Sequence, residues 1–173
     1  VKVSRLNYNK DHGKKSEISF DVNFVLNKYY NIESLHFLAD KNKIHLSNIK
    51  LNKNFEVIDF KKLEIKTFLN EIKNNDFLVD KLETVTISGE VFDAEPILKS
   101  LYKKNDQKIF SKKFNSEIKI NLNKALTGTD DVVSNFAMIA SINKGSYDKL
   151  SLKGNFSENE IVEMSIYQVD NDK

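Results

Sequence analysis

Leu82–Leu101 reads LETVTISGEVFDAEPILKSL, and it combines the two patterns that decide the fold. Apolar and polar residues alternate before Gly89, as in a β-strand with one apolar face. Gly89 interrupts this alternation, and Asp93 has the side chain of a helix N-cap. The apolar spacing that follows predicts one short helix over residues 94–104. If Asp93 caps this helix, Asp93→Ala should lower the free energy of unfolding by about 1 kcal/mol.

The rest of the chain alternates with a period of two residues. The clearest predicted strands are Glu17–Leu26 and Val133–Ile142, each with one apolar and one polar face. A phase slip near Ser47 indicates a bulge in another strand. Asn143–Gly145 has the residues of a hairpin turn. Phe60–Leu82 is the hardest segment, and we interpret it as a strand followed by a helical turn at Phe68, Leu69 and Ile72 that ends near Asn74-Asn75.

These patterns predict a mostly β protein with antiparallel meander pairing and one short helix near 94–104. Strands with one apolar face can bury it in a closed sandwich or barrel with a filled core. They can also form an open, taco-like sheet that curls into a groove. Periodicity does not separate the two. We divide the chain into a β segment (1–81), a strand-to-helix corner (82–104) and an antiparallel β segment (105–173), and expect one continuous fragment of a longer repeat-groove protein.

Composition excludes several classes of protein. The 173 residues include 27 basic and 25 acidic ones, so the net charge is only +2, and Arg5 is the single arginine. Nucleic-acid readers favour arginine, and we therefore expect no nucleic-acid partner. The absence of cysteine excludes disulfides and thiolate metal sites. The chain has no apolar run of about 18 residues, so we expect no transmembrane segment in this fragment.

The sequence carries weak signals for catalysis. His12, His36 and His45 lie in different segments without the spacing of a metal-binding motif. The carboxylate pair Asp130–Asp131 follows Thr-Gly-Thr, where turn chemistry explains it better than acid–base catalysis. No nucleophile motif such as G-x-S-x-G is present. The sequence therefore predicts neither an enzyme nor a metal site nor a cofactor.

Ile87–Leu98, with the sequence ISGEVFDAEPIL, resembles the AsmA-like superfamily of envelope proteins, which includes AsmA, TamB and YhdP. In YhdP-like α-proteobacterial members, the most similar group, a strand ending in glycine leads into an Asp-x-x-Pro-hydrophobic-Leu helix start. Leu126–Gly128 and Leu150–Phe156 are also similar. The resemblance covers about half of the chain. Residues 1–81 share with the family only a sequence pattern typical of β-strands. The high Lys and Asn content departs from the family. Individual positions of this sequence are therefore not aligned with particular groove residues of the family.

The resemblance implies a periplasmic segment of a protein anchored in the inner membrane. Family members form a β groove that is implicated in moving phospholipid toward the outer membrane, in cell-envelope and outer-membrane biogenesis. The expected partners are phospholipid acyl chains and neighbouring segments of the parent protein. For any single candidate groove-lining residue, ordinary core is favoured over contact with lipid. The candidates are Ile18, Phe20, Val22, Phe24, Ile118, Ile120, Leu122, Phe136, Met138, Ile142, Leu150 and Leu152.

Two other functions remain open at this stage. The chain could be a β-rich structural or adhesion module that binds protein partners by its strand edges or its surface. An enzyme is the third alternative. Uptake of lipid by an exposed apolar groove would favour the lipid-conducting segment over the adhesion module.

Overall fold

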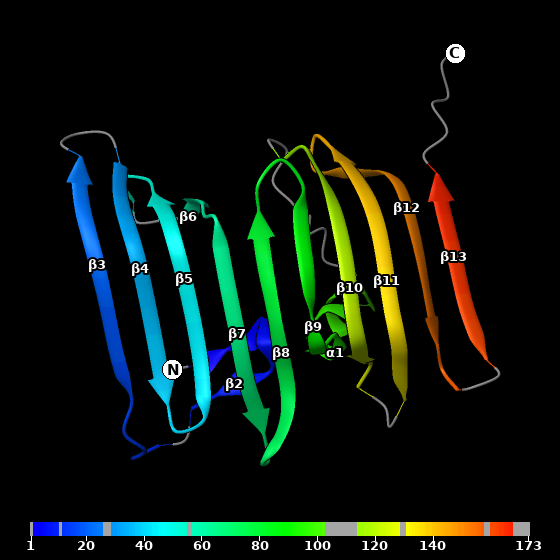
Figure 1. Ribbon diagram of the computed structural model, residues 1–173, viewed down its shortest axis with the longest axis horizontal. Coiled ribbons are helices and arrows are strands. Elements are labelled where there is room, and N and C mark those ends of the chain that lie inside the picture. The colour runs from blue at the N-terminus through cyan, green and yellow to red at the C-terminus, as the bar shows by residue number, and fades with distance from the viewer. Residues whose placement is uncertain are drawn as a thin grey trace.

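The computed structural model describes residues 2–10, 12–25, 29–54, 57–102, 114–128, 131–157 and 160–167. An 11-stranded sheet dominates this part of the chain, with the order β13-β12-β11-β10-β9-β8-β7-β5-β4-β3 and β6 paired to β5 (Figure 1). The sheet is not closed into a barrel. The prediction of a mostly β, open, curled sheet is therefore confirmed.

The first part of the sheet is a run of antiparallel strands connected in sequence order. Their bounds are β3 Glu17–Val25, β4 Tyr29–Ala39, β5 Asn42–Leu51, β6 Val57–Asp59, β7 Lys62–Leu69, β8 Ile72–Lys81 and β9 Val85–Asp93. The second part is an antiparallel meander. It consists of β10 Ser116–Leu126, β11 Val132–Asn143, β12 Ser146–Asn155 and β13 Ile161–Tyr167.

The two parts of the sheet join through the parallel pair β9 and β10. The chain leaves β9 at one end of the sheet and enters β10 at the other, and the connection contains helix α1, Glu95–Tyr102. Parallel neighbours need such a crossover, whereas antiparallel ones need only a turn. The expected antiparallel pairing is thus wrong for β9 with β10. It is correct for all the remaining neighbouring pairs of described strands.

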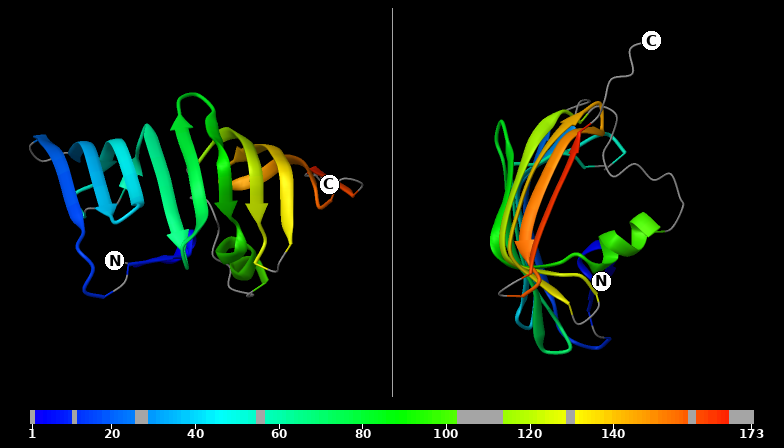
Figure 2. Two further views of the ribbon diagram at one scale, coloured as in Figure 1. Left: turned by 60° about the horizontal axis from the view of Figure 1, so that its bottom comes forward. Right: turned by 90° about the vertical axis from the view of Figure 1, so that its right-hand side faces the viewer.

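The strands curve, and the sheet has a concave and a convex face (Figure 2). Helix α1 and the N-terminal residues lie on the concave side, near the end of the sheet where β9 finishes. The N-terminal residues 2–9, called the strap below, comprise β1 Lys2–Val3, the 3-10 turn η1 Ser4–Leu6 and β2 Tyr8–Asn9. Helix α1 starts at Glu95, one residue after the predicted start. Its predicted end at Lys104 lies outside the described residues.

The predicted helical turn at Phe68–Ile72 is wrong. Lys62–Leu69 and Ile72–Lys81 are instead the antiparallel strands β7 and β8. Asn70 and Glu71 connect them, with φ values of 49° and 68°. Two central residues with positive φ make the tight turn whose twist matches paired strands. The apolar spacing therefore reflects two strand ends on either side of a turn.

Gly89 does not end the strand, because β9 continues to Asp93. A Cβ at Gly89 would lie 2.3 Å from the carbonyl oxygen of Asp76 on β8. The pairing of β8 with β9 shifts register between Asp76 and Phe77, which lets the two backbones approach closely. The glycine thus marks a bulged close approach, which is one of the meanings of glycine inside a strand.

The hairpin prediction at Asn143–Gly145 is confirmed, whereas the bulge predicted near Ser47 is not found, because the register of β4 with β5 does not shift there. Asn143 pairs with Ser146 across a hairpin. Lys144 and Gly145 between them have φ values of 50° and 75°, as in a primed turn. Asn48, the residue after Ser47, has a φ of 51°.

The core lies on the concave face, around the middle of the sheet. Its buried members come from β7 to β11 and pack against half-buried side chains of the strap and of the loops that flank the strands. They are Ile65, Phe77, Val79, Val85, Ile118, Leu122, Ala140 and Ile142. The strap adds a second cluster, in which Tyr8 packs on Phe37 and Ala39.

Candidate apolar groove

One row of residues crosses the concave face from edge to edge and is apolar throughout. Each member is the register partner of the next, and each of the ten strands in the path contributes one. We call this the floor row. From β3 to β13 it is Phe20, Leu35, Leu46, Leu63, Val79, Ile87, Ile120, Met138, Leu152 and Met164.

The floor row is only partly covered. Its two ends are exposed, with 61% of Phe20 and 42% of Met164 accessible to solvent. Val79, near the middle, is buried, and the members between it and the ends are half-buried. An isolated apolar side chain at the surface is unremarkable, but a contiguous row indicates a surface that another apolar group covers.

The central members of the rows on either side of the floor row are more deeply buried than the ends of the floor row. On the strap side, Phe37, Ile65, Phe77 and Leu122 are all buried. On the other side, one row runs through Val85, Ile118, Ala140, Leu150 and Ile166, of which the first three are buried. The floor row therefore lies between two rows whose central members are buried.

The structure brings the predicted lining residues onto this one face and separates them by burial. Ile18, like Phe20, is exposed, whereas Val22, Ile120, Phe136, Met138, Leu150 and Leu152 are half-buried. Ile118, Leu122 and Ile142 are buried in the core cluster. The side chain of Phe24 lies outside the described part of the chain. Contact of these residues with lipid stays a prediction.

The strap and helix α1 together border one side of the concave face (Figure 2). Leu6 packs against both apolar clusters, and Tyr8 meets Phe37 edge to face with 6.0 Å between ring centroids. On the opposite side, Phe60 and Phe114 pack against the core cluster. Side chains from outside the large strands thus border the concave face on both sides.

A buried polar cluster links the strap and helix α1 to the sheet. Asp93 at the end of β9 is 4% exposed. Its Oδ2 accepts hydrogen bonds from the amides of Asn74, at 3.2 Å, and of Asn7, at 3.1 Å. Its Oδ1 accepts one from the backbone N–H of Glu95, at 3.2 Å. One carboxylate therefore links β8, the strap and the first turn of α1, which is more than the predicted cap.

Two neighbouring asparagines on β8 complete this cluster. The side-chain amide of Asn75 donates to Thr67 Oγ1 at 2.9 Å and to the backbone carbonyl of Leu6 at 2.8 Å. Thr67 in turn donates to Asn74 Oδ1 at 2.9 Å. The sequence reasoning missed this cluster because it assigned Asn74-Asn75 to the end of a helical turn. The available signal was a pair of amides between apolar strand positions, since buried polar groups need partners.

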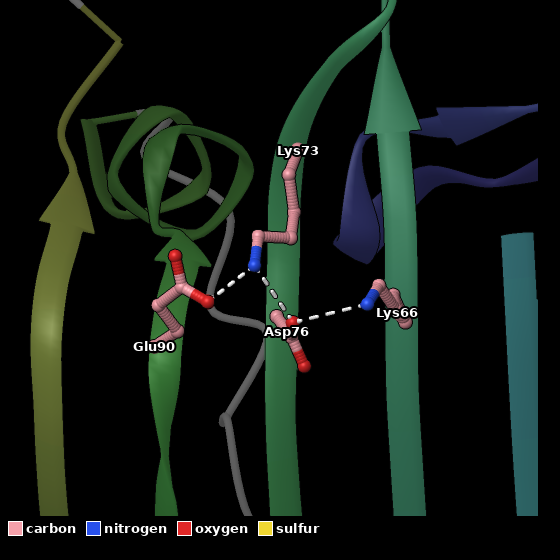
Figure 3. A network of polar contacts seen from close by, with 4 residues as sticks. All are labelled: Lys66, Lys73, Asp76 and Glu90. Carbon is pink, nitrogen blue, oxygen red and sulfur yellow. Dashed lines mark hydrogen bonds and ion pairs between the residues drawn. The ribbon is translucent and has the colours of Figure 1, made fainter. Parts of the chain in front are cut away.

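The convex face is polar and carries networks of ion pairs. Figure 3 shows one, in which Asp76 Oδ2 lies 3.0 Å from the ammonium of Lys73 and 3.7 Å from that of Lys66. Lys73 also pairs with Glu90. The hydrogen bonds to Glu90 and then to Asp76 raise the pKa of Lys73 above its usual value. Exposed pairs of this kind add little to stability, and their solvated face contrasts with the apolar groove.

Two histidines stack on the convex face. His36 on β4 and His45 on β5 are register partners, with 3.9 Å between ring centroids and 13° between ring planes. Glu64 on β7 lies next in the same row, 3.8 Å from His45 Nδ1. Burial, followed by the charge of His36, lowers the pKa of His45, although Glu64 opposes the shift. Protonating His45 is therefore less favourable in the fold than in the unfolded chain.

We expect stability to fall as the pH drops below about 6.5. The unfolded chain binds a proton at His45 near pH 6.5, whereas the folded chain binds it only at lower pH. Stability from neutral His45 is thus complete above pH 6.5 and is lost as the pH falls through the folded pKa. Urea unfolding between pH 7.5 and 5.5 measures the slope. His45→Gln should flatten it, and His36→Gln should reduce it, because one of the causes that lower the pKa of His45 would be removed.

Neither a metal site nor a membrane-spanning helix emerges from the described residues. They contain no group of three or more His, Asp or Glu side chains that could hold a metal ion. None of their helices combines the length and apolar character needed to cross a bilayer. No protein-family model matches the chain, and no curated protein or solved structure matches it. The arguments for function therefore come from the geometry of the sheet and from the residue patterns.

Proposed function

We propose that this chain is a segment of a periplasmic, AsmA-like protein whose apolar groove conducts phospholipid between the inner and outer membranes. The observation that carries the proposal is the floor row, apolar from Phe20 at one edge to Met164 at the other. The resemblance of Ile87–Leu98 to the AsmA-like family supplies the class of ligand and the compartment.

The energetics suit an acyl chain. Neighbouring strands lie about 4.8 Å apart, so the nine steps of the floor row make a path of about 43 Å across the curved sheet. Each CH₂ removed from water gains about 0.8 kcal/mol. The row contains no polar side chain, but Val79 in its middle is buried, so an acyl chain would cross this point only if the side chains that cover Val79 moved aside. The head group would remain in water above the groove.

The open ends of the row favour a conduit over a closed binding pocket. Phe20 and Met164 lie on β3 and β13, the first and last strands of the sheet order. Both side chains are exposed, so the apolar surface continues to each edge of the sheet. Neighbouring segments of the parent protein would extend the groove from these edges, and the anchor in the inner membrane would lie outside the 173 residues.

The second candidate is a β-rich structural or adhesion module that binds a protein strand at an edge. One observation favours it: β13 is an edge strand with Ile161, Ile166 and Tyr167 exposed to 70%, 50% and 63%. An edge strand of this kind can pair with another chain. The two functions differ in their ligand, so a direct test for bound lipid separates them.

We expect the protein, purified from its envelope without detergent, to carry phospholipid that mass spectrometry detects after organic extraction. A photo-crosslinking residue at Met138, on the floor row, should capture lipid. The adjacent Ile139 points to the convex face and is 55% exposed, so the same crosslinker there is the matched control and should capture none. Equal capture at both positions would indicate non-specific labelling and contradict the groove.

The variant Phe20→Asp tests the same prediction through affinity. Because Phe20 is exposed at the sheet edge, an aspartate there remains solvated and the fold should survive. A charge on the floor row should nevertheless reduce bound lipid several-fold, since the acyl chain would have to pass a carboxylate. Ser19→Asp, exposed on the opposite face of the same strand, is the control. Loss of folding in Phe20→Asp would instead indicate a filled core that reaches this edge.

A further inference from the structure

The strap is not part of the large sheet. Among the strands that the structure describes, the two short strands of the strap, β1 and β2, pair with each other and with no other strand. The strap side chains Val3, Leu6 and Tyr8 pack on the apolar face. The strap therefore covers part of the concave face without the backbone ladder that would fix it there.

Four hydrogen bonds, called the latch below, link strap residues Leu6 and Asn7 to Asn74, Asn75, Asp93 and Glu95. The backbone carbonyl of Leu6 accepts from Asn75 at 2.8 Å and from Asn74 at 3.3 Å. The amide of Asn7 donates to Asp93 at 3.1 Å and to Glu95 at 3.5 Å. All four hydrogen bonds use side chains and converge on two consecutive strap residues, so they can be broken together while the sheet remains intact.

The surface beneath the strap is of the same kind as the groove floor. Tyr8 of the strap packs on Phe37 of β4, and Ile44, the register partner of Phe37 on β5, packs against the same cluster. The floor row passes two residues away on the same strands, at Leu35 and Leu46. Lifting the strap would join these two apolar rows and widen the groove on the side of β3.

We propose that the strap is a displaceable cover of the groove and that an acyl chain takes its place over Phe37 and Ile44. This inference rests on the proposed lipid function. Released into water, the strap would leave an uncovered apolar surface, which is unfavourable. Only a ligand that covers the same surface offsets that cost, so opening is coupled to lipid through its preference for the open state.

A spin label on the strap tests displacement directly. The chain contains no cysteine, so Ser4→Cys on the exposed outer side of the strap gives a unique label. Addition of dioctanoyl-phosphatidylglycerol below its critical micelle concentration should increase the mobility of this label. A label at Asn121→Cys, on the exposed face of β10, controls for general loosening and should not respond.

The variant Asn7→Gly tests the latch. Asn7 has φ 50°, which glycine adopts without strain, so the change removes the amide and keeps the backbone conformation. Loss of hydrogen bonds to carboxylates should favour the open state and raise the affinity for the same lipid about tenfold. Asn9→Ala, at an exposed strap position, is the matched control and should bind like the original protein.

The outcomes separate this proposal from the proposed function. Increased mobility at Ser4 together with tighter binding by Asn7→Gly supports the displaceable strap. Lipid binding at saturation with an immobile Ser4 label overturns the strap proposal and leaves the lipid function in place. Failure of the original protein and of Asn7→Gly to bind any lipid overturns both.

Discussion

Phe77→Ala should lower the free energy of unfolding by about 4 kcal/mol, within the range typical of a buried aromatic side chain. Phe77 lies on β8, near the middle of the sheet, and is 8% exposed. It belongs to the core cluster and meets Phe92 edge to face with 5.2 Å between ring centroids. Truncation would leave a cavity between the sheet and the side chains that cover it. Urea unfolding followed by circular dichroism measures the change.

The matched control is Phe20→Ala. Phe20 occupies the same concave face on the edge strand β3, where 61% of it is exposed, so its truncation should cost about 0.5 kcal/mol. The difference between the two losses in free energy of unfolding tests whether side chains pack more tightly at the middle of the concave face than at its edge. Similar losses would contradict a concave face that is filled at its middle and open at its edges, and with it the geometry on which the proposed groove depends.

The sequence predicted the faces of the strands well because alternation is a local property. In β3 the period of two residues places Ile18 and Phe20 on one side, and the register confirms them there beside Phe37 and Leu35. The same alternation runs through β10 and β11. Alternation does not predict which of these apolar residues are buried. Ile118 and Phe20 have the same pattern, yet one lies near the middle of the sheet and is buried, and the other lies at an edge.

The position of each strand in the sheet depends on pairing between distant parts of the chain. The parallel contact of β9 with β10 joins two meanders and places Val85 beside Ile118. No local pattern specifies that contact, because residues on both sides of α1 alternate in the same way. This non-local pairing decides which predicted lining residues enter the core. Ile118, Leu122 and Ile142 join Val85 and Phe77 in the core cluster, whereas Met138 and Leu152 are only half-buried.

The wrong helical turn has a local cause. A tight hairpin is normally predicted from Asn-Gly or a similar pair. Here Asn70 and Glu71 adopt positive φ without a glycine, so the usual signal is absent. Asn74 and Asn75 then looked like the end of a helix, although both are buried in the cluster around Asp93. Correct assignment of the hairpin would have placed two amides on a buried strand and pointed to that cluster.

Asp93→Ala should lower the free energy of unfolding by about 3 kcal/mol, more than the roughly 1 kcal/mol expected of a helix cap alone. The carboxylate is buried and accepts from Asn74, Asn7 and the backbone of Glu95. Alanine would leave these donors without that acceptor in a site with little access to water. Equilibrium unfolding in urea measures the loss, and Asp21→Ala, whose exposed carboxylate accepts from Ser34, is the control.

Asp93→Asn separates capping from the link to the strap. One oxygen can still accept from Glu95, but the other is replaced by an NH₂ group that faces the amide donors of Asn74 and Asn7. Its loss of stability should therefore lie between those of the original protein and Asp93→Ala. A double-mutant cycle with Asn7→Gly should give a coupling of about 1 kcal/mol if Asp93 holds the strap. Additive losses, or a loss of only about 1 kcal/mol in Asp93→Ala, would indicate that Asp93 acts only as a helix cap and that the other hydrogen bonds of the latch anchor the strap.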